Sequence, residues 1–84
     1  MKIVLNEHDL KVDAAQYIYP KGIRALAKHA EVCIDCDAVD DLDSTGIAVL
    51  CAWWQYASVH EVVCEFKLSV TVQEMLLRHG IELP

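Results

Sequence analysis

VCIDCDAVDDLDSTGIAVL, residues 32–50, contains a strand, a loop and the start of a helix in succession, and this order decides the expected fold. The strand is EVCIDC (31–36), whose β-branched and apolar residues are typical of a buried strand. AVDDLD (38–43) follows, and its acidic residues indicate an exposed loop. The apolar run from residue 46 to about residue 58 then predicts a helix that packs on the sheet.

The start of this helix carries two hydroxyl groups directly after a carboxylate. Asp43 is a good N-cap residue, so Ser44 and Thr45 are expected in the first turn, where backbone N–H groups are unpaired and the helix dipole is positive. A hydroxyl there is a candidate phosphorylation site, with Ser44 as first choice and Thr45 as second. Because Asp40 and Asp41 share the loop, a phosphate would concentrate negative charge on one surface and release a bound partner.

Upstream of this stretch, the sequence predicts two short strands and one helix. KIVL (2–5) and LKV (10–12) flank a turn-prone segment and are expected to form a hairpin. The following helix is expected from about Tyr19 to His29 with Pro20 near its first position, because proline is tolerated there and costs about 3 kcal/mol in a helix interior. A longer, kinked helix from Ala14 is the alternative.

Downstream, HEVVCEF (60–66) predicts another strand and TVQEMLLRH (71–79) a third helix. Thr71 and Glu74 have the spacing of a capping box, and Gly80 before an isoleucine suits a left-handed C-terminal cap. The resulting order β-β-α-β-α-β-α predicts an α/β fold. We expect one domain, spanning residues 1–84, with a small mixed or mostly parallel sheet of about four strands and three helices packed on it.

The length and net charge of the chain exclude several classes of partner and location. A chain of 84 residues builds one modest core. Its 13 Asp and Glu residues against 7 Lys and Arg give a net charge of −6, which disfavours nucleic acid and anionic membranes as partners. No apolar run approaches the roughly 20 residues that span a bilayer, and residues 1–9 turn acidic before a signal-peptide core forms. We expect a cytoplasmic protein without direct membrane insertion.

The helix after Ser44 is apolar on all sides, which suggests a partner. Residues placed 100° apart give a core stripe of Ile47, Leu50, Cys51, Trp54 and Ser58. The opposite, outer side then consists of Thr45, Val49, Ala52, Trp53 and Tyr56. Since 84 residues scarcely surround a helix completely, the outer side is expected to bind another protein, with Trp53 and Tyr56 as anchors. The same uncharged surface would also permit weak homodimerisation.

Other chemistries find little support in the sequence. The cysteines are expected to be reduced, and CIDC (33–36) lies in a predicted strand, where positions three apart point to opposite faces, unlike a redox or zinc motif. The chain has neither a Gly-x-Ser-x-Gly nucleophile elbow nor a Gly-rich phosphate loop followed by lysine. We therefore expect no enzyme activity, no metal and no cofactor.

The stretch 32–50 resembles the signature of the STAS family, found in bacterial anti-sigma factor antagonists and in domains attached to anion transporters. In that family a strand ends in Asp, and an Asp-Ser/Thr-x-Gly-Leu/Ile turn opens the next helix, which corresponds here to Asp35, Asp43, Ser44, Gly46 and Ile47. LKVD (10–13) and LSVTVQEMLLRHGI (68–81) are similar to an earlier element and to the last helix of the family. The resemblance covers nearly the whole chain.

The resemblance implies an adaptor that works by contact, and it leaves two roles open. The short spacing between residues 13 and 44 is similar to the STAS subunit of Mla-type phospholipid-transport ABC systems, which implies binding to the transporter's ATPase subunit. The sigma-regulating branch implies instead an anti-sigma kinase as partner and phosphorylation of Ser44 as the switch. Nucleotide binding, as in some relatives, is a third option. The expected partner-binding residues are Asp41, Asp43, Ser44, Thr45, Val49, Trp53 and Tyr56.

Overall fold

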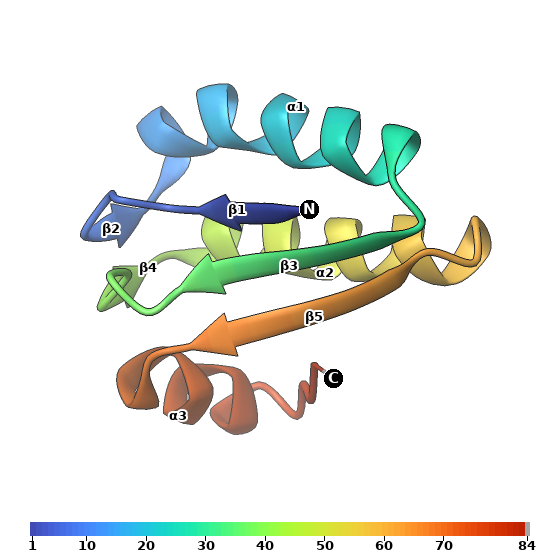
Figure 1. The fold of residues 1–84 in the computed structure, drawn as a ribbon. Coiled ribbons are helices and arrows are strands. Elements are labelled where there is room, and N and C mark those ends of the chain that lie inside the picture. Colours follow the sequence, from blue (N-terminus) through green and yellow to red (C-terminus); the bar gives the residue numbers. More distant parts are fainter. Residues whose placement is uncertain (84) are drawn as a thin grey trace.

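Residues 31–36 form the central strand of a three-stranded sheet, as their apolar character predicts (Figure 1). The computed structural model describes residues 1–83. Its elements in chain order are β1 (Lys2–Val4), β2 (Asp9–Leu10), α1 (Val12–Lys28), β3 (Glu31–Cys36), β4 (Asp41–Leu42), α2 (Ser44–Val59), β5 (Val63–Leu68) and α3 (Val70–Arg78). The fold is therefore α/β with three helices, as expected.

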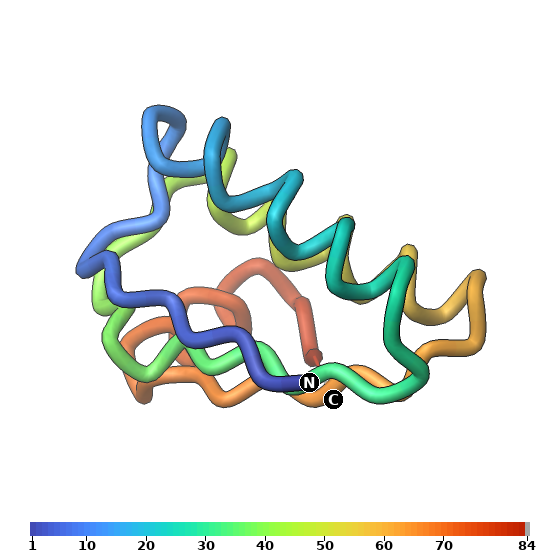
Figure 2. The backbone as a smooth tube through the Cα atoms, turned by 45° about the horizontal axis from the view of Figure 1, so that its top comes forward, coloured from blue at the N-terminus to red at the C-terminus, as the bar shows by residue number. Residues whose placement is uncertain are grey.

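Every strand pair in the described residues is parallel. The main sheet has the order β1-β3-β5, and a short second sheet pairs β2 with β4. Ile3, Ile34 and Phe66 are register partners across the three main strands, and all three are buried. Figure 2 shows α1 and α2 side by side over this face of the sheet, with α3 on the same side. The core thus lies between one sheet face and the helices.

The predicted hairpin of residues 2–5 and 10–12 is wrong, and of the two expected arrangements, mixed or mostly parallel, the structure has the parallel one. β1 runs parallel to β3, while β2 belongs to the second sheet and pairs with β4. The backbone N–H groups of Asp40 and Asp41 both donate to the carbonyl of His8, at 2.9 and 3.3 Å. The loop before β2 is therefore hydrogen-bonded to the loop before β4. The turn between β1 and β2 does not pair these two strands with each other.

Helix α1 begins earlier than predicted and passes through Pro20. The longer helix, considered from Ala14, is closer to the structure, which begins the helix at Val12. Proline removes one backbone N–H, so the carbonyl of Gln16 loses its helical donor. Both Pro20 and Gln16 are exposed, so water can hydrate that carbonyl and the interruption is tolerated.

Helix α3 ends as predicted but begins with a different cap. Ser69, not Thr71, is the N-cap residue, and its hydroxyl accepts a hydrogen bond from the N–H of Val72 at 3.2 Å. At the other end Gly80 has a φ of 70°, which confirms the left-handed cap. The N–H of Ile81 donates to the carbonyl of Leu76 at 2.9 Å, closing the motif.

Candidate functional site

The loops at the carboxyl ends of the strands bring the starts of α1 and α2 to one end of the molecule (Figure 1). Asp43 precedes α2 in an extended conformation, and its carboxylate accepts a hydrogen bond from the N–H of Gly46 at 3.0 Å. This geometry confirms Asp43 as the N-cap residue. A hydrogen bond to a helix N-terminus of this kind stabilises the protein by about 1 kcal/mol.

Gly46 holds the first turn of α2 close to the small sheet. A Cβ atom at this position would overlap the backbone carbonyl of Leu10 and lie 2.9 Å from the Cβ atom of Leu42. Only glycine allows this approach, so the start of α2 is fixed against β2 and β4. The position of Ser44 on the surface follows from this contact.

The two candidate hydroxyl groups differ in accessibility. Ser44 is exposed at the first position of α2, whereas Thr45 is half-buried. Asp40, in the loop just before β4, is exposed as well, and Asp41 is half-buried. Ser44 is therefore the more accessible acceptor for a modifying enzyme, and it lies on an acidic end of the molecule.

Lys11 offsets part of the negative charge at this acidic end. The ammonium group of Lys11, at the N-cap position of α1, lies 2.9 Å from a carboxylate oxygen of Asp41. The hydrogen bond and charge of Asp41 raise the pKa of Lys11 above its ordinary value. Because both side chains are about half exposed, water screens the pair and its contribution to stability is small.

The aspartate near the end of β3 has a structural role in the same region. The Asp35 carboxylate accepts a hydrogen bond from the N–H of Asp37 at 3.0 Å, and this bond is the main cause of its lowered pKa. Lys2 on the neighbouring strand lies 3.6 Å away and lowers the pKa further. Asp35 thus shapes the turn that leads toward β4 and Ser44.

The expected outer side of α2 is wrong at two positions. Trp53 is only 1% exposed, and its indole Nε1–H donates to the carbonyl of Tyr19 at 3.1 Å. Val49 is 6% exposed. Tyr56 is half-buried, with its ring 4.2 Å from that of His60. Trp53 and Val49 are core residues of the monomer and cannot serve as contact residues for a partner.

The error is a rotation of the helix about its axis. An uncharged helix has no charged face to mark its outer side. Placing residues 100° apart therefore does not determine which side of α2 packs on the core. The structure buries Gly46, Val49, Leu50, Trp53 and Ala57. The predicted core member Trp54 is 42% exposed, and Ser58 is exposed.

The true outer face of α2 carries small and polar side chains around one tryptophan. We call this surface the outer α2 face; its exposed or half-buried members are Ser44, Ala48, Cys51, Trp54, Gln55 and Ser58. Ser44, Ala48, Cys51, Gln55 and Ser58 recur at spacings of four and three residues. This stripe of small and polar residues is the sequence signal that marks the outer side of α2. The face remains uncharged, as predicted.

A groove borders the outer α2 face on the side of the C-terminal segment. It has a volume of about 420 Å³ and lies between α2 and residues 80–83, with Trp54, Ile81 and Leu83 among its lining residues. The groove leaves apolar surface accessible next to Trp54. Its residues 80–83 are not among the site residues that the sequence suggested.

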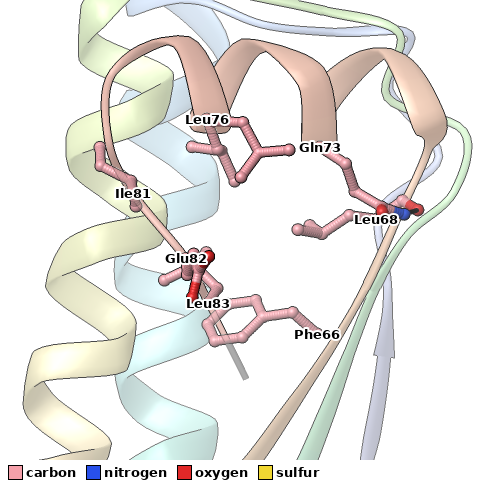
Figure 3. Close-up of a pocket in the computed structure, with 8 residues that line it drawn as sticks. Phe66, Leu68, Gln73, Leu76, Ile81, Glu82 and Leu83 are labelled. Carbon is pink, nitrogen blue, oxygen red and sulfur yellow. Dashed lines mark hydrogen bonds between the residues drawn. The ribbon is translucent and has the colours of Figure 1, made fainter.

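A second pocket, of about 370 Å³, lies between β5, α3 and the same segment (Figure 3). Figure 3 shows Phe66, Leu68, Leu76, Ile81 and Leu83 around it. The amide nitrogen of Gln73 donates to the carbonyl of Leu68 at 2.9 Å and is thereby engaged. Glu82 is the one ionisable residue among the described residues that line it. Most of the other described lining side chains are apolar, which suits contact with an apolar group.

The cysteines are all free thiols. Cys36 is buried and Cys33 is half-buried, at positions of β3 that face opposite sides of the sheet. Burial raises the pKa of Cys36 to about 12 and that of Cys64 to about 11. These two thiols are therefore uncharged and poorly nucleophilic at neutral pH. Among residues 1–83, no three His, Cys, Asp or Glu side chains gather into a metal-binding group.

Comparison of the chain with models of known protein families gave no match, and comparison with curated protein sequences gave no match either. In the part of the chain that the structure describes, no helix has the length and apolar character needed to cross a bilayer. The site is therefore interpreted from its own geometry.

Proposed function

We propose that the chain is a non-enzymatic protein-interaction module of the STAS type, which binds its partner through the Ser44 end of α2 and the outer α2 face. The observation that carries this proposal is the exposed Ser44 at a capped helix start, continuous with an uncharged helix surface. A solvated helix face normally carries charged residues, and α2 has none from Ser44 to Val59. A protein partner that covers this face explains their absence.

The proposed partner is the ATPase subunit of a Mla-type phospholipid-transport ABC system, which the domain regulates from the cytoplasmic side. Lasting interfaces are depleted of charge at their centre and anchored by aromatic residues. The outer α2 face has this composition, with Trp54 beside the groove lined by Ile81 and Leu83. The choice of this partner is supported by the short spacing from Asp13 to Ser44, together with CID (33–35), which is similar to the STAS subunit of Mla-type systems.

The contact residues differ in part from the expected set. Asp41, Asp43, Ser44 and Thr45 remain as the acidic and hydroxyl part of the surface, and Tyr56 contributes its half-exposed ring. Trp54 replaces Trp53 as the aromatic anchor, because 42% of Trp54 is accessible and only 1% of Trp53 is. Val49 is omitted because it is buried.

The alternative function is that of an anti-sigma factor antagonist that is switched by phosphorylation of Ser44. The accessibility of Ser44 favours it, since a kinase must reach the hydroxyl. A phosphate adds about −1.5 to −2 charges beside Asp40 and Asp41. Against a complementary partner surface, that charge costs several kcal/mol, about a hundredfold in affinity or more.

The experiment measures binding of purified variants to the ATPase subunit and to the anti-sigma kinase by isothermal titration calorimetry. Trp54→Ala is expected to weaken binding of the true partner at least tenfold, because an anchor contributes about 2 kcal/mol. Val63→Ala, which changes a 65% exposed residue of β5 on the opposite sheet face, is the matched control. Unchanged binding of both proteins by Trp54→Ala would refute the proposed surface.

Two further variants distinguish the roles. Ser44→Asp abolishes binding in the phosphorylation switch, whereas Ser44→Ala leaves it intact. In a constitutive transporter subunit Ser44 is a packed polar contact, and both variants weaken binding similarly. Loss with neither variant would remove Ser44 from the interface.

A further inference from the structure

The exposed side of α1 differs in charge from the rest of this acidic chain. From Ala14 to Ala30 the sequence contains no Asp or Glu, although 13 of the 84 residues are acidic. The same segment carries Lys21, Arg24 and Lys28. Three of the seven Lys and Arg residues thus lie on the last turns of one helix, without a carboxylate between them.

These cations share one face of α1 with an exposed tyrosine. Tyr17, Lys21, Arg24 and Lys28 follow one another at spacings of four, three and four residues, which places them in a single row on the helix. All four are exposed, and Tyr17 is 79% accessible. Figure 1 shows α1 along one side of the molecule, and its buried residues are Ala15, Ile18, Gly22, Ala25 and Leu26, so the exposed row lies on the solvent side of the helix. We call it the basic α1 row.

Among residues 1–83, no cation of the basic α1 row forms a salt bridge. The salt bridges among residues 1–83 are Lys2 with Asp35 and Lys11 with Asp41. Lys28 also complements the negative C-terminal end of α1, but this effect is confined to the last turn. Lys21 and Arg24 lie one to two turns further back, so helix stability does not account for them.

The net charge of −6 does not govern this surface. Asp13 lies eight residues before Lys21, which corresponds to about 12 Å along the helix axis. At an ionic strength of about 0.1 M, charges are screened beyond about 10 Å, so Lys21 is largely screened from Asp13. At the other end of the row, Glu31 follows Lys28 by three residues and Glu61 lines a pocket together with Lys28, so Lys21 and Arg24 are the cations that an anionic surface meets with least competition.

From this arrangement we infer that the basic α1 row adsorbs to the headgroups of an anionic lipid bilayer, with α1 parallel to the membrane surface. Lysine and arginine attract the headgroups, and the amphipathic ring of Tyr17 suits the interface between water and lipid. A flat headgroup surface requires charge but no shape complementarity, which fits a row of flexible cations on a convex helix. This inference goes beyond the proposed function and does not rest on it, because the row is separate from the outer α2 face.

The test is co-sedimentation of the full chain with phosphatidylcholine vesicles that contain about one-third phosphatidylglycerol. Each cation near such a surface raises partitioning about fivefold. The triple variant Lys21→Gln, Arg24→Gln and Lys28→Gln is therefore expected to bind about a hundredfold more weakly. Binding is measured at about 0.1 M salt, and raising the salt to about 1 M should release the unaltered protein, because the headgroups are then screened beyond about 3 Å.

The matched control removes three other cations: Lys2→Gln, Lys67→Gln and Arg78→Gln. Both triple variants have a net charge of −6 − 3 = −9, so any difference between them reports the position of the charge. The control should bind within about twofold of the unaltered chain. Circular dichroism checks that each variant is folded. Absence of binding, equal binding to pure phosphatidylcholine, or equal loss in both triple variants would overturn the inference.

Discussion

At the scale of single residues, the contact between Trp53 and Gly22 determines how α2 packs on α1. The indole ring of Trp53 lies where a side chain of residue 22 would be, and a Cβ atom there would overlap the ring. The indole N–H donates to the carbonyl of Tyr19, so its polar atom is satisfied inside the core. One glycine on α1 thus permits one buried tryptophan on α2.

Gly22→Ala therefore tests the packing between the two helices. In an exposed helix this change stabilises by roughly 1 kcal/mol, because alanine has the higher helix propensity. Here the methyl group has to displace the ring of Trp53, and overpacking costs about 1 to 3 kcal/mol. We expect a lower free energy of unfolding in urea titrations. An increase in stability would show that Trp53 does not lie against Gly22.

At the scale of elements, the cap of α3 connects this helix to the loop before β4. The hydroxyl of Ser69 accepts from the N–H of Val72 and donates to the carbonyl of Val39 at 2.6 Å. One side chain therefore caps the helix and holds the loop that leads to Ser44. The capping box predicted at Thr71 and Glu74 lies within the helix instead.

Ser69→Ala should lower the free energy of unfolding by about 1 to 2 kcal/mol, since it removes the cap and leaves the carbonyl of Val39 without this donor. Thr71→Ala is the matched control, because Thr71 is exposed inside the first turn of α3. It should change stability by less than about 0.5 kcal/mol. Equal effects in chemical denaturation would assign no special role to Ser69.

At the scale of the whole molecule, the helices that pack on one sheet face bury two thiols. As a result, the free energy of unfolding decreases at alkaline pH. The pKa of Cys36 is raised from 9.0 to about 12 and that of Cys64 to about 11. The unfolded chain ionises these thiols at lower pH than the folded protein does. Their contribution is complete below pH 9 and is lost as the pH rises through about 11 and 12.

We expect the free energy of unfolding to fall as the pH rises above about 9, toward about 11 and 12. The variant with Cys36→Val and Cys64→Val lacks both thiols and should show a shallower decline in urea titrations. All other residues are the same in both proteins, so the difference between the curves isolates the two thiols. Parallel curves would contradict the burial of Cys36 and Cys64.

Features with short-range causes were predictable from the chain. The strand at 31–36, the cap at Asp43 and the left-handed turn at Gly80 depend on residues within a few positions of each other. Their propensities act locally, so a single sequence contains them. The candidate site at Ser44 follows from the same local rules.

Tertiary contacts decided the remaining features. The pairing of β1 with β3 joins segments about thirty residues apart, and no local pattern distinguishes it from a hairpin. The inner side of α2 depends on Gly22 and Tyr19 of another helix, because α2 itself is apolar all round and carries no charge to orient it. Which tryptophan is buried and which is exposed was thus set by the shape of the neighbouring helix.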